Sequence, residues 1–183
     1  MDDFEYFVNK VNDFHGHICT GIVLGTRMSM AALRYLAVDP HGKKKNLICY
    51  AEIDRCMTDA VMIVTGCSAG RRTLKLVDYG KFAMTLINQD TGKAIRITVN
   101  DYHRSEDMEE TKRTIMAIPD PRLLSFKDVY VTIPENDLPG FPRKTATCSV
   151  CGEQIMDGSD TEHNGAVLCK GCANGTYYRV ISK

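Results

Sequence analysis

Apolar residues recur every three or four positions in the first part of the chain. This helical period runs through residues 4–11 and again through residues 18–36, and the tripeptide His15-Gly16-His17 interrupts it. Such spacing places the apolar side chains on one face of a helix, which is the face that a core buries. The pattern therefore predicts two helices that flank a histidine-bearing connection.

Alternating apolar and polar positions mark the expected strands. Residues 47–53 alternate, which predicts a half-buried strand. Residues 82–87 and 94–99 predict an antiparallel pair, because Gly92 in the segment between them can take the positive φ that a hairpin loop needs. Residues 129–133 alternate again and predict one more strand.

Two shorter helices are expected between and after these strands. Residues 58–64 have helical spacing, and Gly66 supplies the residue that ends a helix. Ser105 and the acidic residues after it suit a helix start, since negative charge is stabilised at the positive end of the helix dipole. The apolar stripe of this helix continues to Ile118, and Pro119 ends it.

A change in composition then marks a domain boundary. Three of the six prolines fall close together, at Pro134, Pro139 and Pro142. Such clustering is typical of a linker. The 183 residues, 44% of them hydrophobic, suffice for one core and a small appendage. We expect a core domain over residues 1–135, a linker over 136–147 and a small module over 148–183.

Charge and hydropathy narrow the classes of partner. The 23 basic residues balance 23 acidic ones, so no net field attracts nucleic acid or anionic membranes, and nucleic acid is not the expected partner. The N-terminal residues lack the positive region and apolar run of a secretory signal. No stretch approaches the ~20 apolar residues of a membrane span. We expect a cytoplasmic protein with no membrane association.

The eight cysteines indicate metal binding or catalysis rather than disulfides, because the cytosol keeps thiols reduced. Four of them form two Cys-x-x-Cys pairs with the spacing of a structural zinc site, and these are Cys148, Cys151, Cys169 and Cys172. Asn164-Gly165 between the pairs predicts a hairpin turn. We expect a zinc ribbon or treble clef whose four ligands leave no open coordination position.

A second group of metal ligands follows the first predicted helix. His15, His17 and Cys19 occupy alternate positions, and an extended backbone would direct all three side chains to one side. Cys19 also lies near the start of the next helix, where backbone N–H groups favour a thiolate. The segment therefore predicts a metal site or a reactive nucleophile, although each residue taken alone is equally compatible with a structural role.

Two further segments can add to this core site. Cys56 precedes the helix over residues 58–64 and Asp59 follows within one turn, so both can complete a mixed Cys/His/carboxylate site. Cys67 lies between Gly66 and Gly70, where the backbone can approach a ligand or a metal closely. A buried structural cysteine is the alternative for Cys67.

Several motifs together resemble the FmdE family of formylmethanofuran dehydrogenase proteins. They are Phe-His-Gly-His-Ile-Cys-Thr-Gly-Ile-Val-Leu-Gly at residues 14–25, Arg-Cys-Met-Thr-Asp-Ala at 55–60, Thr-Gly-Cys-Ser-Ala-Gly at 65–70 and Tyr-Gly-Lys at 79–81. The chain departs from the family pattern at Thr20, where proline is frequent, at Ser68, where threonine is usual, and at Arg71-Arg72.

The resemblance implies a fold, an assembly and a context. The fold is α+β, with helices packed on a mainly antiparallel sheet and a C-terminal zinc finger, and the assembly is an intertwined homodimer. The histidine and cysteine motifs are expected at a metal-binding active site. The context is the one-carbon metabolism of formylmethanofuran dehydrogenase, although the reaction of the FmdE protein itself does not follow from the family name.

Two functions fit these patterns best. The first is a metal-dependent oxidoreductase or thiol redox protein, with zinc or iron in the core site and structural zinc in the module. The second is an accessory protein that docks on a larger oxidoreductase complex. A regulator that binds nucleic acid is disfavoured by the acidic module. The expected metal ligands are the four module cysteines with His15, His17, Cys19 and Cys56, and the expected catalytic residues are Cys19, Cys56, Asp59 and Cys67.

Overall fold

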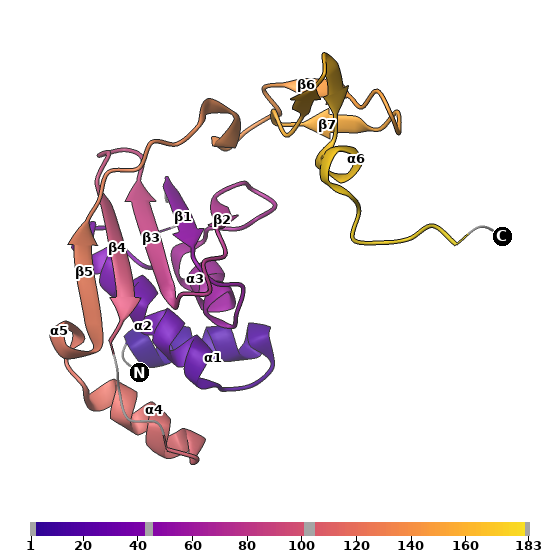
Figure 1. The fold of residues 1–183 in the computed structure, drawn as a ribbon. Helices are drawn as coiled ribbons and strands as arrows, with labels where there is room; N and C mark the ends of the chain where they lie inside the picture. Colours follow the sequence, from indigo (N-terminus) through magenta and orange to yellow (C-terminus); the bar gives the residue numbers. More distant parts are fainter. Residues whose placement is uncertain (1–2, 43–45, 101–104, 182–183) are drawn as a thin grey trace. The chain divides into compact units, whose positions relative to one another are not determined.

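The computed structural model describes residues 3–42, 46–100 and 105–181 (Figure 1). The chain divides into two units, Met1–Thr132 and Ile133–Lys183. Each unit has its own cluster of buried apolar side chains. Among the helices of the described residues, none is long and apolar enough to cross a membrane.

The helices of the first unit follow the predicted apolar stripes closely. Their bounds are α1 Asp3–His15, α2 Thr20–Tyr35, α3 Met57–Thr65, α4 Met108–Ala117 and α5 Asp120–Leu123. Gly66 ends α3 with a φ of 76°, as its position predicts. Asp107, rather than Ser105, caps α4, because its carboxylate accepts a hydrogen bond from the Glu109 backbone N–H at 2.9 Å.

The sheet of this unit has five strands in the order β2-β1-β3-β4-β5. The strands are β1 Leu47–Ala51, β2 Leu74–Leu76, β3 Ala83–Asn88, β4 Ala94–Val99 and β5 Leu124–Asp128. Only the β1–β2 pair is parallel, and the other three pairs are antiparallel. The expected α+β fold with a mainly antiparallel sheet is therefore confirmed, and Gly92 takes a φ of 71° in the β3–β4 hairpin.

The two edge strands do not follow the hydrophobic pattern. The strand predicted over residues 129–133 is wrong, because the last strand of the sheet is β5, five residues earlier. In β5 only Leu124 is buried, so the segment shows no alternation, and hydrogen bonds to β4 define the strand instead. The pattern does not predict β2 either, since three residues are too few to show a period.

One face of the sheet and three helices share the main core. Alternate residues Leu47, Cys49 and Ala51 of β1 enter this core together with buried side chains of α1, α2 and α3. Figure 1 shows these three helices gathered on one side of the sheet. Arg27 of α2 fastens the C-terminal end of α4, because its guanidinium donates to the Met116 carbonyl at 3.2 Å and to the Ile118 carbonyl at 2.5 Å.

Two glycines on α2 allow α3 to approach closely. A Cβ at Gly21 would lie 2.8 Å from the Cys56 Cβ, and a Cβ at Gly25 would lie 2.8 Å from the Ala60 Cβ and 3.0 Å from the Met57 Cα. Carbon atoms that are not bonded to each other do not approach so closely. The two helices can therefore pack at this distance only because side chains are missing from one side of α2.

Gly25→Ala is expected to destabilise the first unit by about 1–2 kcal/mol. Alanine gains about 0.5–1 kcal/mol of helix propensity, but overpacking against the Met57 backbone costs about 1–3 kcal/mol because a backbone cannot rotate away. Urea unfolding would measure the difference. Gly70→Ala is the control, since its Cβ would meet nothing within 4 Å. Equal stability of the Gly25 and Gly70 variants would contradict the close packing.

The second unit consists of two small hairpins and one short helix. Its elements are η1 Glu135–Asp137, β6 Thr145–Thr147, β7 Gln154–Met156, β8 Thr161–His163, β9 Ala166–Leu168 and α6 Lys170–Asn174. Asn164 and Gly165 have φ values of 50° and 77°, as the predicted turn between β8 and β9 requires. The buried apolar residues of this unit are Cys148, Ile155 and Leu168. So small a core is insufficient to hold the unit together without an additional cross-link.

Candidate metal centres

The first candidate centre is the group of four cysteines in the second unit. Cys148 and Cys151 lie in the connection between β6 and β7, Cys169 caps α6, and Cys172 lies within α6. Their four sulfur atoms lie within 4.8 Å of one another. A hairpin turn and a helix start thus supply one pair each, which is the treble-clef alternative of the two that the sequence left open.

Backbone N–H groups prepare this centre for negative charge. The Cys169 N–H donates to the Cys148 sulfur at 3.3 Å, and the Cys172 N–H donates to the Cys169 sulfur at 3.3 Å. Hydrogen bonds from the backbone N–H groups of Cys151, Cys169 and Val150 lower the pKa of Cys148 to about 6. Cys148 is therefore a thiolate at neutral pH, as a metal ligand must be.

The remaining thiols cannot all ionise without a cation. A hydrogen bond with the neighbouring Cys169 thiol, followed by burial and the other cysteines, raises the pKa of Cys172 to about 12. A divalent cation removes this repulsion and displaces the protons. Four thiolates in a tetrahedral group suit zinc and leave no position for a substrate, so the module is consistent with a closed zinc site.

The second candidate centre lies where α1 ends and α2 begins. Gly16 follows α1 with a φ of 92°, and this left-handed residue turns the chain between His15 and His17. The two imidazole rings lie 4.6 Å apart between centroids. The ligand atoms of His15, His17 and Cys19 are all within 4.8 Å of one another. The structure thus brings together the three residues that the motif placed at alternate positions.

Asp59 of α3 orients one of these ligands. Its carboxylate lies 2.7 Å from Nδ1 of His15, and Nε2 of the same ring lies 3.8 Å from the Cys19 sulfur. A proton held on Nδ1 by the carboxylate leaves the Nε2 lone pair available to a metal. The His15 side chain is only 13% exposed, so this orientation is held by packing as well as by the hydrogen bond.

Cys56 lies beside the Cys19 thiol but outside the group of three that share the 4.8 Å limit. It precedes the first residue of α3, as Cys19 precedes that of α2. Burial, and then its hydrogen bond with Cys19, raise the pKa of Cys56. The starts of two helices therefore converge with the end of a third around this cluster, and Gly21 provides the space between the two thiols.

The structure places Cys67 elsewhere. It is 2% exposed in the main core, and its thiol donates to the Leu47 carbonyl at 3.6 Å. Its neighbourhood includes Cys49, whose pKa is raised well above the usual value by burial and then by the charge of Cys67. Cys67 is not among the residues of the His/Cys cluster, and its role as a catalytic thiol stays a prediction.

Two features near the cluster were missed in the sequence. Gly21 and Gly25 have the four-residue spacing that brings helices close together, and this spacing was a readable indication. The Thr20 hydroxyl, next to Cys19, donates to the Met108 sulfur at 3.6 Å, which places the start of α4 beside the start of α2. No local pattern relates residues so far apart in the chain.

Comparisons with known proteins agree with this architecture. The family model described as FmdE, molybdenum formylmethanofuran dehydrogenase operon, matches residues 14–125. A probable S-adenosyl-L-methionine-binding protein of Archaeoglobus fulgidus is 30% identical over 207 residues, which cover 95% of this chain and 54% of that protein. The chain thus spans about half the length of that relative.

A solved structure has the same fold. The crystal structure of an FmdE-like protein of tungsten formylmethanofuran dehydrogenase, from Syntrophus aciditrophicus, superimposes with a TM-score of 0.62 at 23% sequence identity. The match covers 96% of this chain and 95% of that chain. Both units of the chain are therefore represented in a known architecture.

Proposed function

The chain belongs to the FmdE family, and from this we propose that it binds a functional metal in its core cluster and a structural zinc in its C-terminal module. The observation that carries the proposal is the convergence of the His15, His17 and Cys19 ligand atoms within 4.8 Å, with Asp59 oriented to fix the His15 ring. Structural cysteines and histidines have no need of such an arrangement.

Each residue of the core cluster has a separate task in this proposal. His15, through Nε2, and Cys19, through its sulfur, form the inner side of the site, and His17 forms the exposed side. Cys56 is the fourth ligand candidate, held beside Cys19 by the packing of α2 on α3. Asp59 keeps the proton of His15 on Nδ1. The partial positive charge at the start of α2 stabilises the Cys19 thiolate.

The chemistry follows from the number and type of these ligands. Three or four protein ligands leave room for water or a substrate on the exposed side of His17, and bound zinc would activate that water whereas bound iron would carry an electron. Both alternatives agree with a metal-dependent or redox role in formylmethanofuran-type one-carbon metabolism. Asp59 is the carboxylate placed to accept a proton through His15.

An accessory role is the second candidate, and exposed apolar side chains favour it. In the described part of the second unit, Phe141, Tyr177 and Ile181 are each more than 90% exposed. Apolar side chains in such positions are typical of contact surfaces. In this role the chain would dock on a larger oxidoreductase or on a second copy of itself, and sedimentation at increasing concentration would reveal the homodimer.

Cys19→Ala is expected to remove the core metal while leaving the module zinc in place. The parent protein should carry two metal ions per chain by elemental analysis, and the variant should carry one, because a soft ligand is lost from the inner side of the site. In a cobalt-substituted sample, the thiolate charge-transfer absorption of the core site should also disappear.

Cys49→Ala is the matched control for this experiment. Cys49 is a fully buried core cysteine on β1 that belongs to neither cluster of ligands. Its variant should keep both metal ions. If Cys19→Ala retains full metal content and an unchanged spectrum, the core residues have structural roles and the proposed metal function is wrong.

A further inference from the structure

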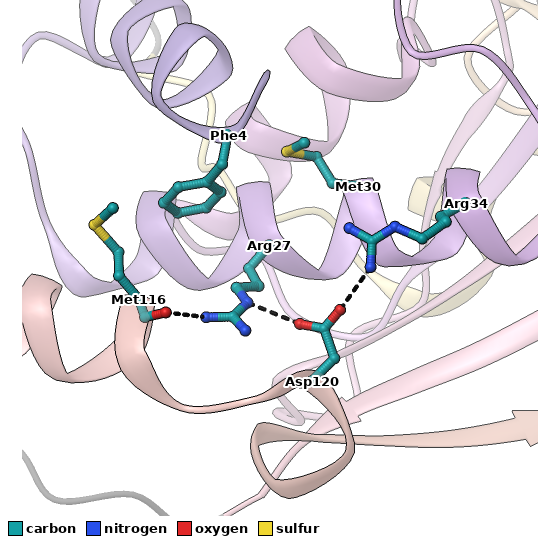
Figure 2. A pocket seen from close by; sticks show the side chains of 6 residues that line it. All are labelled: Phe4, Arg27, Met30, Arg34, Met116 and Asp120. Carbon is teal, nitrogen blue, oxygen red and sulfur yellow. Dashed lines mark hydrogen bonds and ion pairs between the residues drawn. The ribbon is translucent and has the colours of Figure 1, made fainter. Parts of the chain in front are cut away.

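A hollow of about 320 Å³ lies beside α2, on a wall formed by residues of neither metal cluster. Figure 2 shows its two sides. Phe4, Met30 and Met116 form an apolar side, and Arg27, Arg34 and Asp120 form a polar side. A volume of this size lies at the lower end of the range for small-molecule sites. The combination of an apolar side and convergent charged groups is typical of a ligand site.

Arg27 is already used by the fold. Its guanidinium donates to Asp120 at 2.8 Å and to the backbone carbonyls at the end of α4, and its side chain is only 15% exposed. Its charge is therefore balanced by the Asp120 carboxylate and by the negative end of the α4 dipole. These contacts fix the polar side of the hollow before any ligand arrives.

Arg34 is placed to receive an anion. Within the described residues its Nη1 donates to Asp120 at 2.9 Å, and the side chain is 70% exposed, so its other N–H groups face solvent. Asp120 holds the guanidinium in position, as Figure 2 shows, and reduces the entropy that an incoming ligand would have to remove. The polar side thus presents one more positive charge than negative.

The surroundings of Arg34 favour a singly charged ligand. A second hollow, of about 410 Å³, shares Met30 and Arg34 with the first and includes Asp3 and Asp39 on its wall. Asp3 bonds to His41 at 3.0 Å, and Asp39 accepts the His41 backbone N–H at 3.0 Å. Two carboxylates on this side repel a second negative charge. A carboxylate is therefore a better match than a phosphate dianion.

The apolar side determines the rest of the ligand. Phe4 offers a ring face or edge, and the thioethers of Met30 and Met116 adapt to flat or irregular shapes and interact well with aromatic rings. We propose that this hollow binds a small monocarboxylate with an aromatic or thioether body, whose carboxylate pairs with Arg34 and whose body packs on Phe4, Met30 and Met116.

The methionine methyl groups of the full-length protein test this proposal directly. With ¹³C-methyl methionine, 3-phenylpropionate should shift the Met30 and Met116 resonances in a saturable manner. The matched neutral alcohol, 3-phenylpropanol, and the dianion phenyl phosphate should each bind at least about tenfold more weakly, because the charge-assisted bond to Arg34 is lost or the second charge is repelled. Met28 and Met84, both fully buried, serve as internal references for the fold.

Arg34→Gln should weaken binding of 3-phenylpropionate at least about tenfold, and Arg34→Lys should restore part of it. Arg113→Gln, on an exposed position of α4 outside the hollow, should change nothing. Absence of a saturable shift, equal binding of the alcohol, preference for phenyl phosphate, or full binding by Arg34→Gln would each overturn the proposal. Because no metal ligand lines the hollow, these outcomes are independent of the metal content of the protein.

Discussion

Replacing Cys148 by alanine is expected to remove one zinc ion per chain and to unfold the second unit while the first unit stays folded. The second unit buries only Cys148, Ile155 and Leu168 as its apolar core. Three side chains cannot offset the conformational entropy of the segment, so the free energy of zinc binding must supply its stability. Cys148 is also the thiol that the backbone N–H groups hold as a thiolate, with a pKa of about 6.

Elemental analysis and amide NMR spectra would measure the two effects. Resonances of the described residues 133–181 should collapse toward random-coil positions, and those of the five-stranded sheet should not move. A chelator added to the parent protein should reproduce the same selective change, and the zinc should be lost more readily as the pH falls, because protons compete for the thiolates.

Ser149→Ala is the matched control, since Ser149 lies between the two ligands of the first pair and is exposed. This variant should retain its zinc and its spectrum. Zinc loss without unfolding would show that the module has a sufficient core of its own, and unfolding of the sheet together with the module would show that the two units are not independent.

Arg96→Met is expected to destabilise the first unit by about 3–5 kcal/mol. Arg96 of β4 forms two hydrogen bonds with the Glu52 carboxylate, at 2.6 and 2.7 Å. The Glu52 side chain is only 8% exposed. Removing the guanidinium leaves a carboxylate buried without a partner, and that desolvation penalty is the source of the loss. The Arg96 side chain is 24% exposed, so water offsets part of the penalty and the lower end of the range applies.

A double variant separates the ion pair from its surroundings. Glu52→Leu combined with Arg96→Met removes both charges, and most of the lost stability should return, because no buried charge is left unpaired. Urea unfolding of the parent, the two single variants and the double variant would give the coupling energy. If the two single losses simply add in the double variant, the pair is not a coupled unit and the expectation is wrong.

The Glu52–Arg96 pair also shows where local pattern reading stops. Tyr50, two residues before Glu52, pairs with Thr85, and Thr85 pairs with Arg96, so the register of three strands brings the two charges to the same face of the sheet. Neither residue has an unusual sequence neighbourhood. Only the strand order β1-β3-β4 makes them partners.

Helices and inner strands were readable in the sequence because burial on one face imposes a period. α1, α2 and α3, with β1, β3 and β4, bury residues at regular intervals, and all six were predicted near their observed positions. The edge strands β2 and β5 bury too little to show a period. Their place depends on hydrogen bonds to a neighbouring strand, which the amino-acid pattern does not encode locally.

The candidate metal ligands were predictable for a different reason. In each Cys-x-x-Cys pair a single turn brings both thiols together, and His15, His17 and Cys19 lie within five residues, so their proximity is local. The FmdE resemblance rested on the same motifs, and the family match over residues 14–125 confirms it. By contrast, the expected site included Cys67, whose sequence motif contains no information about which side of the core it enters.

The sequence by itself therefore determined the FmdE family, the α+β class, and the two groups of ligands. Tertiary structure alone decided that Asp59 holds the His15 ring, although 44 residues separate them, and that Cys56 lies beside Cys19. The physical reason is the approach of α3 to α2 over Gly21 and Gly25, since the position of a side chain across a helix interface depends on packing distance. Local spacing decides which residues can act as ligands, and helix packing decides which of them meet.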